Sequence, residues 1–552
     1  MIARATGAVS RLLPHRADYA ELPRSWRRDI LAGVTVGVVA LPLALAFGIS
    51  SGVGAAAGLI TAVVAGLVAA VFGGSHVQVS GPTGAMAVVL APIVAQHGIG
   101  SIALVTVLAG LVVVAAGVTG LGRAVTFIPW PVIEGFTLGI AAIIFLQQVP
   151  AAFGTTAPAG TRTLPAAWAV ATHADWPAAW RPLAVVGFVA LLMIALPRLH
   201  RAIPESLTAV VAATVIVAAF GVPVARIGAL PSHLPAPVMP HADLGALRTL
   251  VGAALAIAAL AAIESLLSAR VAATMSPTGP YDPDRELVGQ GLASVASGVF
   301  GGMPATGAIA RTAVNVRSGA RTRVSAIVHS LLLLGVVYLA TGPVSAIPLS
   351  ALAGVLMVTS FRMISAGTVR KILRSTRSDA VTFVLTALVT VCFDLIEAVE
   401  IGIVFAAFFA LRTVARRSSV VREELPGPPQ PGDDRIALLR LDGAMFFGAA
   451  ERISKAIAGD HDPRGAEVSV VIIRMSQIGM LDATGAHTLA ELAEELESRG
   501  ITVIIKGVQP EHLTLLANMG IVEALRHENH LIDSLDEAIA HARSHVNPAL
   551  HP

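Results

Sequence analysis

The chain has 552 residues, of which 55% are hydrophobic and 13% are charged, and its mean hydropathy is +0.76. Soluble proteins carry about 25% charged residues, so the composition predicts an integral membrane protein in a lipid bilayer. The net charge of +3 conceals an acidic segment, 434–545, in which 17 acidic residues outnumber 10 basic ones. The basic excess elsewhere lies beside apolar segments, as at cytoplasmic membrane boundaries, which argues against a nucleic-acid partner.

Apolar segments of helical length follow one another from residue 30 to residue 414. Arginines before and after this region predict that both ends are cytoplasmic, which requires an even number of crossings. Seven spans in each half then imply that the halves are inserted in opposite orientations, as an inverted repeat. The first set is 30–49, 54–72, 82–96, 101–121, 127–149, 182–198 and 203–221, and the second is 247–270, 287–300, 304–317, 323–341, 345–363, 379–394 and 396–414.

Two of these spans are short and opened by a proline. Pro82 and Pro304 lie 222 positions apart, as do Pro42 and Glu264. A helix from Pro82 to residue 94 would rise only about 20 Å, less than the roughly 30 Å hydrocarbon core. An extended segment, 76–80, followed by a half-helix that starts at Pro82 would complete the crossing.

Half-helices that meet in the protein interior present unpaired N–H groups and the positive ends of their dipoles. The two breaks therefore predict a site for a small anion. The alternative is that these glycines and prolines only kink the helices or ease their packing.

Glu264 interrupts the apolar run 255–268, where a carboxylate costs about 2.5–3.5 kcal/mol. It must face a cavity or a partner, and Ser268 shares its helix face. Glu264 is interpreted as the carrier of a coupling proton. Two alternatives stay open: a cation ligand together with Ser268, and a hydrogen-bonded structural glutamate. Arg311, two turns into the second half-helix, would strengthen the field over the anion, or would instead extend to the cytoplasmic surface.

The segment 426–432 is rich in proline and glycine, which marks a domain boundary. After it, strands at 436–441, 468–475 and 501–506 alternate with helices at 449–458, 483–497 and 510–519, which predicts a small α/β domain. The expected divisions are a cytoplasmic segment (1–29), a transport domain (30–415), a linker (416–433), the α/β domain (434–545) and a tail (546–552).

The chain resembles the SulP family of anion transporters, the prokaryotic relatives of solute carrier family 26. The stretches that carry the resemblance are Asp29–Gly33, Ser80–Gly84, Ile263–Leu267, Glu286–Gly291 and Thr306–Thr312. The resemblance implies a core domain of helices 1–4 and 8–11 that moves against a gate domain of helices 5–7 and 12–14, in a homodimer.

The stretch Met480–Gly485 resembles a STAS domain, which implies a cytoplasmic partner. In the anti-sigma-factor antagonists the residue after the aspartate is a phosphorylated serine. Here that residue is Ala483, so phosphorylation at this position is excluded. Thr484 is expected to cap the following helix.

The resemblance also implies the site residues and the transport class. Many SulP members carry glutamine after the proline of helix 1, where this chain has Leu43, which weakens the case for sulfate. Sodium-coupled bicarbonate members carry aspartate and threonine at the positions of Glu264 and Ser268, and the difference favours protons. The implied substrate contacts are Thr83, Gly84, Thr306, Gly307, Ala308 and Arg311, with a coupling-ion site at Glu264 and Ser268.

The sequence therefore predicts a secondary active transporter, not an enzyme, in the bacterial inner membrane with both termini cytoplasmic. The expected activity is proton-coupled symport of a dicarboxylate such as fumarate, by elevator-like movement of the core. The alternatives are sodium-coupled bicarbonate or sulfate transport, anion exchange, and a membrane sensor that signals through the STAS domain. No cofactor and no metal are expected, and the absence of a metal-ligand cluster or a nucleophile-and-base pair within the spans argues against an integral-membrane enzyme.

Overall fold

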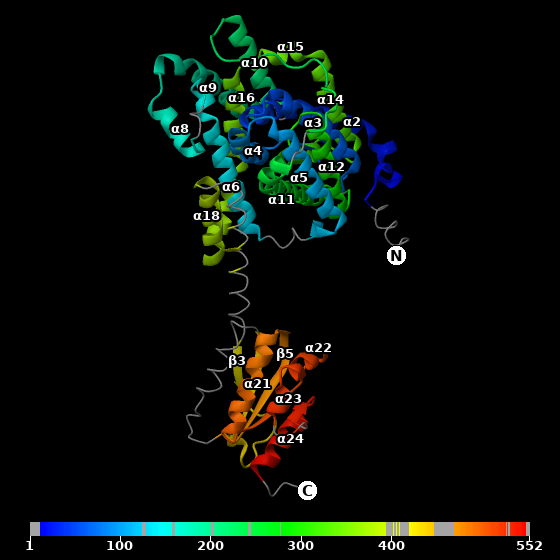
Figure 1. Ribbon diagram of the computed structural model, residues 1–552, viewed down its shortest axis with the longest axis vertical. Helices are drawn as coiled ribbons and strands as arrows, with labels where there is room; N and C mark the ends of the chain where they lie inside the picture. The colour runs from blue at the N-terminus through cyan, green and yellow to red at the C-terminus, as the bar shows by residue number, and fades with distance from the viewer. Residues whose placement is uncertain are drawn as a thin grey trace. The chain divides into compact units, whose positions relative to one another are not determined.

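The computed structural model describes residues 12–123, 129–156, 161–199, 204–240, 244–276, 278–392, 401, 404, 405, 408, 419–445, 468–525, 527 and 530–547. The chain forms two compact units, residues 1–403 and 404–552 (Figure 1). Each unit has its own hydrophobic core.

Where the structure describes the first unit, it is helical apart from two very short strands. Its helices in chain order are η1 (Arg16–Tyr19), α2 (Leu22–Ser50), α3 (Ala55–Phe72), α4 (Gly84–His97), α5 (Ser101–Val118), α6 (Trp130–Gln147), α7 (Val149–Ala152), α8 (Thr163–Thr172), α9 (Trp176–Leu199), α10 (Glu205–Ala219), α11 (Leu244–Met275), α12 (Pro283–Val299), α13 (Ile309–Arg317), α14 (Val324–Leu339), α15 (Thr341–Ser345), α16 (Leu349–Met363), α17 (Ala366–Leu373) and α18 (Arg377–Cys392).

These helices confirm the predicted architecture of a multi-pass membrane protein. Each predicted span from 30–49 to 379–394 falls on one of them, whereas span 396–414 lies largely outside the described residues. Among the described helices, 7 are long and apolar enough to cross a bilayer unaided. Helix α4 has 14 residues and α13 only 9, so both are the half-helices that the sequence predicts.

Small residues allow these helices to pack closely. A Cβ atom on Gly58 of α3 would lie 2.0 Å from the carbonyl oxygen of Ala44 in α2. A Cβ atom on Gly291 of α12 would lie 2.6 Å from the carbonyl oxygen of Gly110 in α5. Interfaces of this kind are typical of membrane helices, where small residues bring two backbones into contact.

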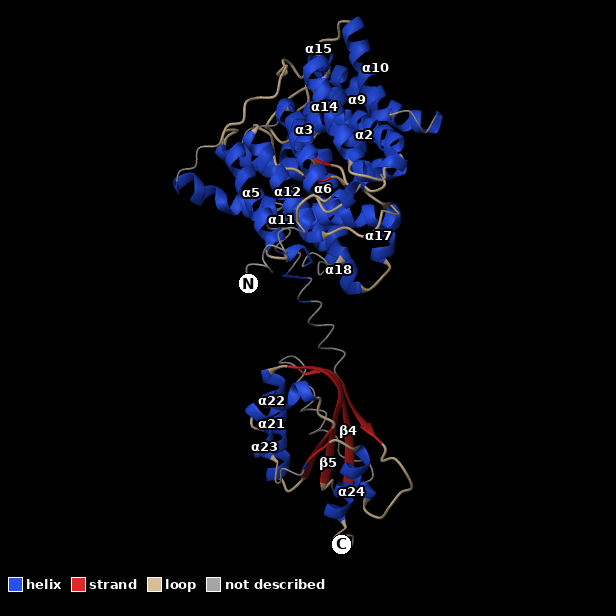
Figure 2. Ribbon diagram, turned by 90° about the vertical axis from the view of Figure 1, so that its right-hand side faces the viewer, coloured by secondary structure: helices blue, strands red, loops and turns tan. Residues whose placement is uncertain are grey.

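The two half-helices are joined by a short antiparallel pair of strands, seen as small red segments within the helical unit in Figure 2. Strand β1 (Ser80–Gly81) pairs with β2 (Thr306–Gly307), so that Ser80 lies opposite Gly307 and Gly81 opposite Thr306. The half-helices begin later than predicted, at Gly84 and Ile309, because the residues after each proline continue as extended chain. Pro82 thus precedes α4 and is not in its first turn.

The second unit contains a five-stranded sheet in the order β3-β4-β5-β6-β7. Strand β3 is antiparallel to β4, and the other neighbours are parallel. The strands are β3 (Ser419–Glu423), β4 (Ile436–Met445), β5 (Val470–Leu481), β6 (Thr502–Lys506) and β7 (Leu531–Ile532), and the helices are η3 (Asp433–Arg435), α21 (Ala483–Ser498), α22 (Pro510–Asn518), α23 (Ile521–Ala524) and α24 (Leu535–Val546).

Helices cover both faces of this sheet, with α21, α22 and α23 on one side and α24 on the other (Figure 2). Strand β3 falls within the stretch 416–433 predicted as a linker, so part of that stretch belongs to the sheet. The other predicted domain limits stay predictions, and the predicted helix at 449–458 lies outside the described residues. The expected cap of α21 is wrong: the carboxylate of Asp482, not Thr484, accepts the amide N–H of Gly485 at 2.7 Å.

A candidate anion site between two half-helices

The N-termini of α4 and α13 are held by hydrogen bonds between the two halves of the chain. The amide of Ala308 donates to the carbonyl oxygen of Val79 at 2.9 Å, which extends the β1–β2 pairing to the first turn of α13. Thr83 caps α4 by accepting the amide N–H of Met86 at 3.4 Å. Each half-helix therefore presents the remaining first-turn amides that a helix leaves without an internal partner.

Glu264, on α11, lies where these two segments meet. Its Oε2 accepts hydrogen bonds from the hydroxyls of Thr83 at 2.9 Å and Thr306 at 2.7 Å. The two hydroxyl oxygens are themselves 3.1 Å apart. One carboxyl oxygen thus contacts a residue from each half of the predicted repeat.

The same face of α11 holds the second strand through serine side chains. The amide of Gly307 donates to Oγ of Ser265 at 3.1 Å. Among the described residues, Ser268 makes its side-chain hydrogen bond with Thr312 and not with Glu264: its Oγ lies 3.2 Å from Oγ1 of Thr312. Thr312 also accepts the amide N–H of Val79 at 3.1 Å, so Ser268 belongs to the network that fixes the strands.

Arg311 is buried, with 2% of its surface exposed, and does not extend to the surface of the unit. Its Nη2 donates to the carbonyl oxygen of Pro82, which fastens α13 to the chain before α4. Its Nη1 has no hydrogen-bond partner among the described residues, and the same holds for the amide group of Gln78. Gln78 packs closely on Gly307, because a Cβ atom added to Gly307 would lie 1.8 Å from Nε2 of Gln78.

A cavity opens beside Glu264, between the half-helix starts and the helices α6, α16 and α18. Ala85 and Ile309, from the first turns of α4 and α13, lie on its wall with Glu264. The remaining wall is largely apolar, with hydroxyls from Thr137 and Thr386. The cavity is thus bounded on one side by helices of the predicted core and on the other by helices of the predicted gate.

The structure brings several of the predicted site residues into one hydrogen-bonded group and places the others around it. Thr83, Glu264 and Thr306 form the group, next to which lie Gly84, Gly307 and Ala308 in adjoining chain positions. Arg311 bonds to Pro82, the residue before Thr83, and Ser268 bonds to Thr312. No role was predicted for Thr312 and Gln78, because only the pairing of β1 with β2 brings their side chains to the site.

Comparisons with known proteins agree with this architecture. The sulfate permease family matches residues 26–386, and the STAS domain matches residues 428–538. The putative sulfate transporter YvdB of Bacillus subtilis is 33% identical over 93% of this chain and 97% of its own length. The bicarbonate transporter BicA of Synechocystis is 32% identical over 95% of this chain and 96% of its own.

A solved structure supports the fold over nearly the whole chain. The murine Slc26a9 anion transporter in its inward-facing state gives a TM-score of 0.84 over 97% of this chain and 94% of its own, at 18% identity. Since the family match extends over more than half of the chain, the protein belongs to the sulfate permease (SulP) family of anion transporters, with a C-terminal STAS domain, and is not an enzyme.

Proposed function

We propose that this transporter takes up a small dicarboxylate such as fumarate together with protons, with Glu264 as the proton carrier. In this proposal the anion binds at the first turns of α4 and α13, near Thr83, Gly84, Thr306, Gly307, Ala308 and Arg311. The protein works as a homodimer in the bacterial inner membrane with both termini cytoplasmic. The helices of the core carry the site past the gate helices in an elevator-like movement.

The observation that carries the proposal is the carboxyl of Glu264 on the wall of a cavity that two half-helix N-termini adjoin. Helix N-termini favour anions through their amides and dipoles. The unpaired Nη1 of Arg311 and the unpaired amide of Gln78 add buried donors close to the same strands. Unsatisfied buried donors are costly, and an anion that accepts their hydrogen bonds removes that cost.

The contacts of Ser268 favour the proton over a bound cation. A cation held by Glu264 and Ser268 needs both oxygens on one ion. Ser268 instead lies 3.2 Å from Thr312 and is fully buried, with 0% of its surface exposed. A proton needs the carboxyl of Glu264 alone, and Thr83 and Thr306 already support that group.

A second candidate is sodium-coupled bicarbonate uptake, because the Synechocystis relative is named a bicarbonate transporter and aligns over 95% of this chain. In that case Glu264 would contribute to a sodium site. Sulfate is a third substrate to test, since the Bacillus relative is named a putative sulfate transporter.

The decisive experiment measures uptake of radiolabelled fumarate, bicarbonate and sulfate into liposomes that contain the purified protein. Inward proton and sodium gradients are imposed separately, and protein-free liposomes provide the background. We expect fumarate uptake that follows the proton gradient. Sodium-driven bicarbonate uptake would instead establish the second candidate, and ligand binding without any flux would favour a sensor.

The variant Arg311→Ala tests the anion site in the same assay. We expect a higher concentration of fumarate for half-maximal uptake, because Nη1 no longer contributes a charged donor. Arg311→Lys keeps the charge and should recover part of the affinity. An unchanged apparent affinity in Arg311→Ala would remove Arg311 from the site.

A further inference from the structure

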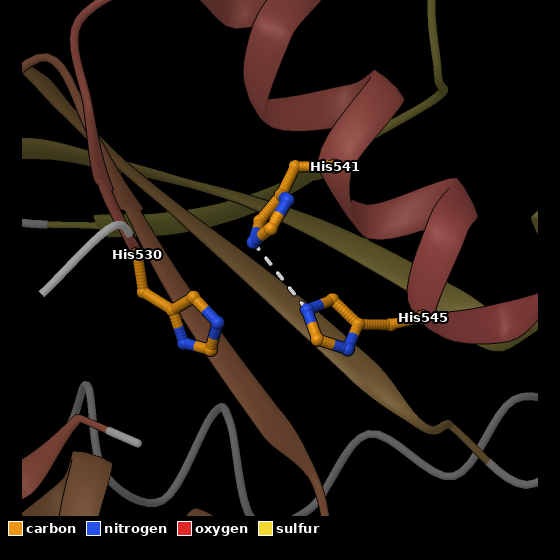
Figure 3. A group of neighbouring side chains, drawn as sticks. All are labelled: His530, His541 and His545. Carbon is orange, nitrogen blue, oxygen red and sulfur yellow. Dashed lines mark hydrogen bonds between the residues drawn. The ribbon is translucent and has the colours of Figure 1, made fainter. Parts of the chain in front are cut away.

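Three histidines of the second unit gather where the end of the sheet meets the C-terminal helix (Figure 3). His541 and His545 lie four residues apart on α24, which places them on one face of the helix. His530 immediately precedes β7, and its ring lies beside those of the other two histidines. One ring nitrogen from each of the three lies within 4.8 Å of the others.

His530 is the buried member of this group, with 0% of its surface exposed, whereas His541 is half-buried and His545 is exposed. Among the residues that the structure describes, the ring nitrogens of His530 make no hydrogen bond of good geometry and have only a weaker contact with the backbone of Val503. A buried imidazole whose nitrogens are poorly paired is costly in a folded protein. The cost falls if one of its nitrogens binds a ligand at the point where the three rings meet.

The distances suit a metal ion. Nε2 of His541 and Nε2 of His545 are 3.4 Å apart. Two nitrogens that bind one tetrahedral zinc ion at about 2.0–2.1 Å are separated by about 3.3 Å. The ring of His530 lies a little farther away, with its centroid 5.3 Å from that of His541 and 5.4 Å from that of His545, and it would have to turn towards them to bind the same ion.

The type of ligand indicates which metals the site would take. Imidazole ligands select zinc, copper and nickel over magnesium or calcium, which prefer oxygen.

We propose that His530, His541 and His545 form a binding site for a zinc-class transition-metal ion on the STAS domain. Three protein ligands leave the fourth tetrahedral position to water or to a donor from solution. The ion would tie the chain before β7 to the last two turns of α24, and so hold this helix against its face of the sheet. This proposal is independent of the substrate and of the coupling ion.

The test uses the full-length protein in detergent, purified without a polyhistidine tag and stripped of metal with a chelator. Zinc is titrated in competition with a chromogenic chelator, and cobalt provides a second readout through the visible absorption of a tetrahedral site. We expect one zinc ion per protomer and the intense cobalt bands of tetrahedral coordination. Absence of stoichiometric zinc binding would overturn the proposal and leave the three rings as a packed aromatic group.

His545→Gln is the diagnostic variant, because His545 is exposed and its replacement should not disturb the core. Loss of a second-shell residue weakens metal sites by about 10- to 100-fold, so loss of a ligand should weaken zinc binding by at least about 100-fold. His487→Gln is the matched control, since His487 is an exposed histidine of α21 that faces Glu491 at 3.4 Å. Equal zinc affinity in the two variants would also overturn the proposal.

Discussion

At the scale of single residues, Glu264 is the point at which three elements meet. Its Oε2 accepts from Thr83, which caps α4, and from Thr306, which belongs to β2, while Glu264 itself belongs to α11. The location of this acid in an apolar run was predictable, because a carboxylate is costly there and stands out. Its two hydroxyl donors come from segments that are distant in the sequence and meet only in the folded protein. Thr83 and Thr306 were therefore predictable as site residues, but their contacts were not.

Glu264→Gln should abolish the response of uptake to a proton gradient while leaving the fold intact. The glutamine carbonyl oxygen can still accept from Thr83 and Thr306, but the side chain no longer exchanges a proton. An inward gradient of one pH unit is worth about 1.4 kcal/mol, or about a tenfold accumulation in a one-proton symport. We expect liposomes with the variant to lose this accumulation.

The matched control for this variant is Glu134→Gln. Glu134 is an acid of α6 that accepts the indole N–H of Trp130 at 3.1 Å at an exposed position. Uptake by this control should retain its dependence on the proton gradient. Unchanged proton coupling in Glu264→Gln would exclude Glu264 as the proton carrier.

At the scale of elements, a small residue in an apolar segment can indicate either a close contact between two helices or a break in a helix. Gly58 and Gly84 look alike in the sequence, yet Gly58 lets α3 approach α2 and Gly84 begins a half-helix. The existence of both half-helices was predictable from proline and from length. Their starts were not, because the pairing of β1 with β2 delays α13 until Ile309.

The STAS domain gives a similar division between what was predictable and what was not. The strands β4, β5 and β6 follow from runs of branched apolar residues, and α21 from its periodicity. Strand β3 and helix α24 were not predicted. The residues of β3 become a strand because they pair with β4. Helix α24 is stabilised by the burial of Ala538, Ile539 and Ala542 against the sheet.

Gly58→Ala should destabilise the packing of α2 against α3. The added methyl would lie 2.0 Å from the backbone oxygen of Ala44 and 3.0 Å from Cα of Gly48, so the helices must separate. Overpacking of this kind costs about 1–3 kcal/mol. We expect a lower unfolding temperature, measured by loss of the monodisperse peak after heating in detergent. Gly335→Ala on α14, with nothing within 4 Å of the new methyl, should leave that temperature unchanged.

At the scale of the whole transport unit, the N-terminal segment is fastened to the second half of the chain. Asp18 accepts hydrogen bonds from Nη1 and Nη2 of Arg285, at 3.0 and 2.6 Å, and lies 3.5 Å from Nε of Arg323. Arg285 belongs to α12, and Arg323 directly precedes α14. One carboxylate thus connects η1 to two elements of the other repeat.

Asp18→Asn should lower the stability at neutral pH, because it leaves buried arginines without their counter-charge. Burial alone would raise the pKa of Asp18, but the hydrogen bonds from Arg285 and His15 and the nearby charge of Arg323 outweigh it and lower the pKa to about 2. A carboxyl whose pKa is lower in the folded state stabilises the fold at pH values above its pKa in the unfolded chain, which is near 3.9. This contribution is lost as the pH falls towards 2.

We therefore expect the difference in unfolding temperature between the native chain and Asp18→Asn to be largest at pH 7 and to become smaller below about pH 4. The measurement is thermal unfolding of both proteins across this range. A difference that stays constant down to the lowest pH at which the protein remains soluble would contradict the role of the Asp18 carboxylate.

In the proposed proton symport, the single carboxyl shared by α11, α4 and β2 would also limit the charge that one transport cycle moves. As the proton carrier of that proposal, Glu264 would release one proton per cycle, so a dicarboxylate dianion that travels with it would carry one net negative charge across the bilayer. An interior potential of −100 mV opposes that movement by about 2.3 kcal/mol. Fumarate uptake should therefore be electrogenic and quicken when valinomycin and an inward potassium gradient make the liposome interior positive, whereas bicarbonate carried with one proton would be electrically silent.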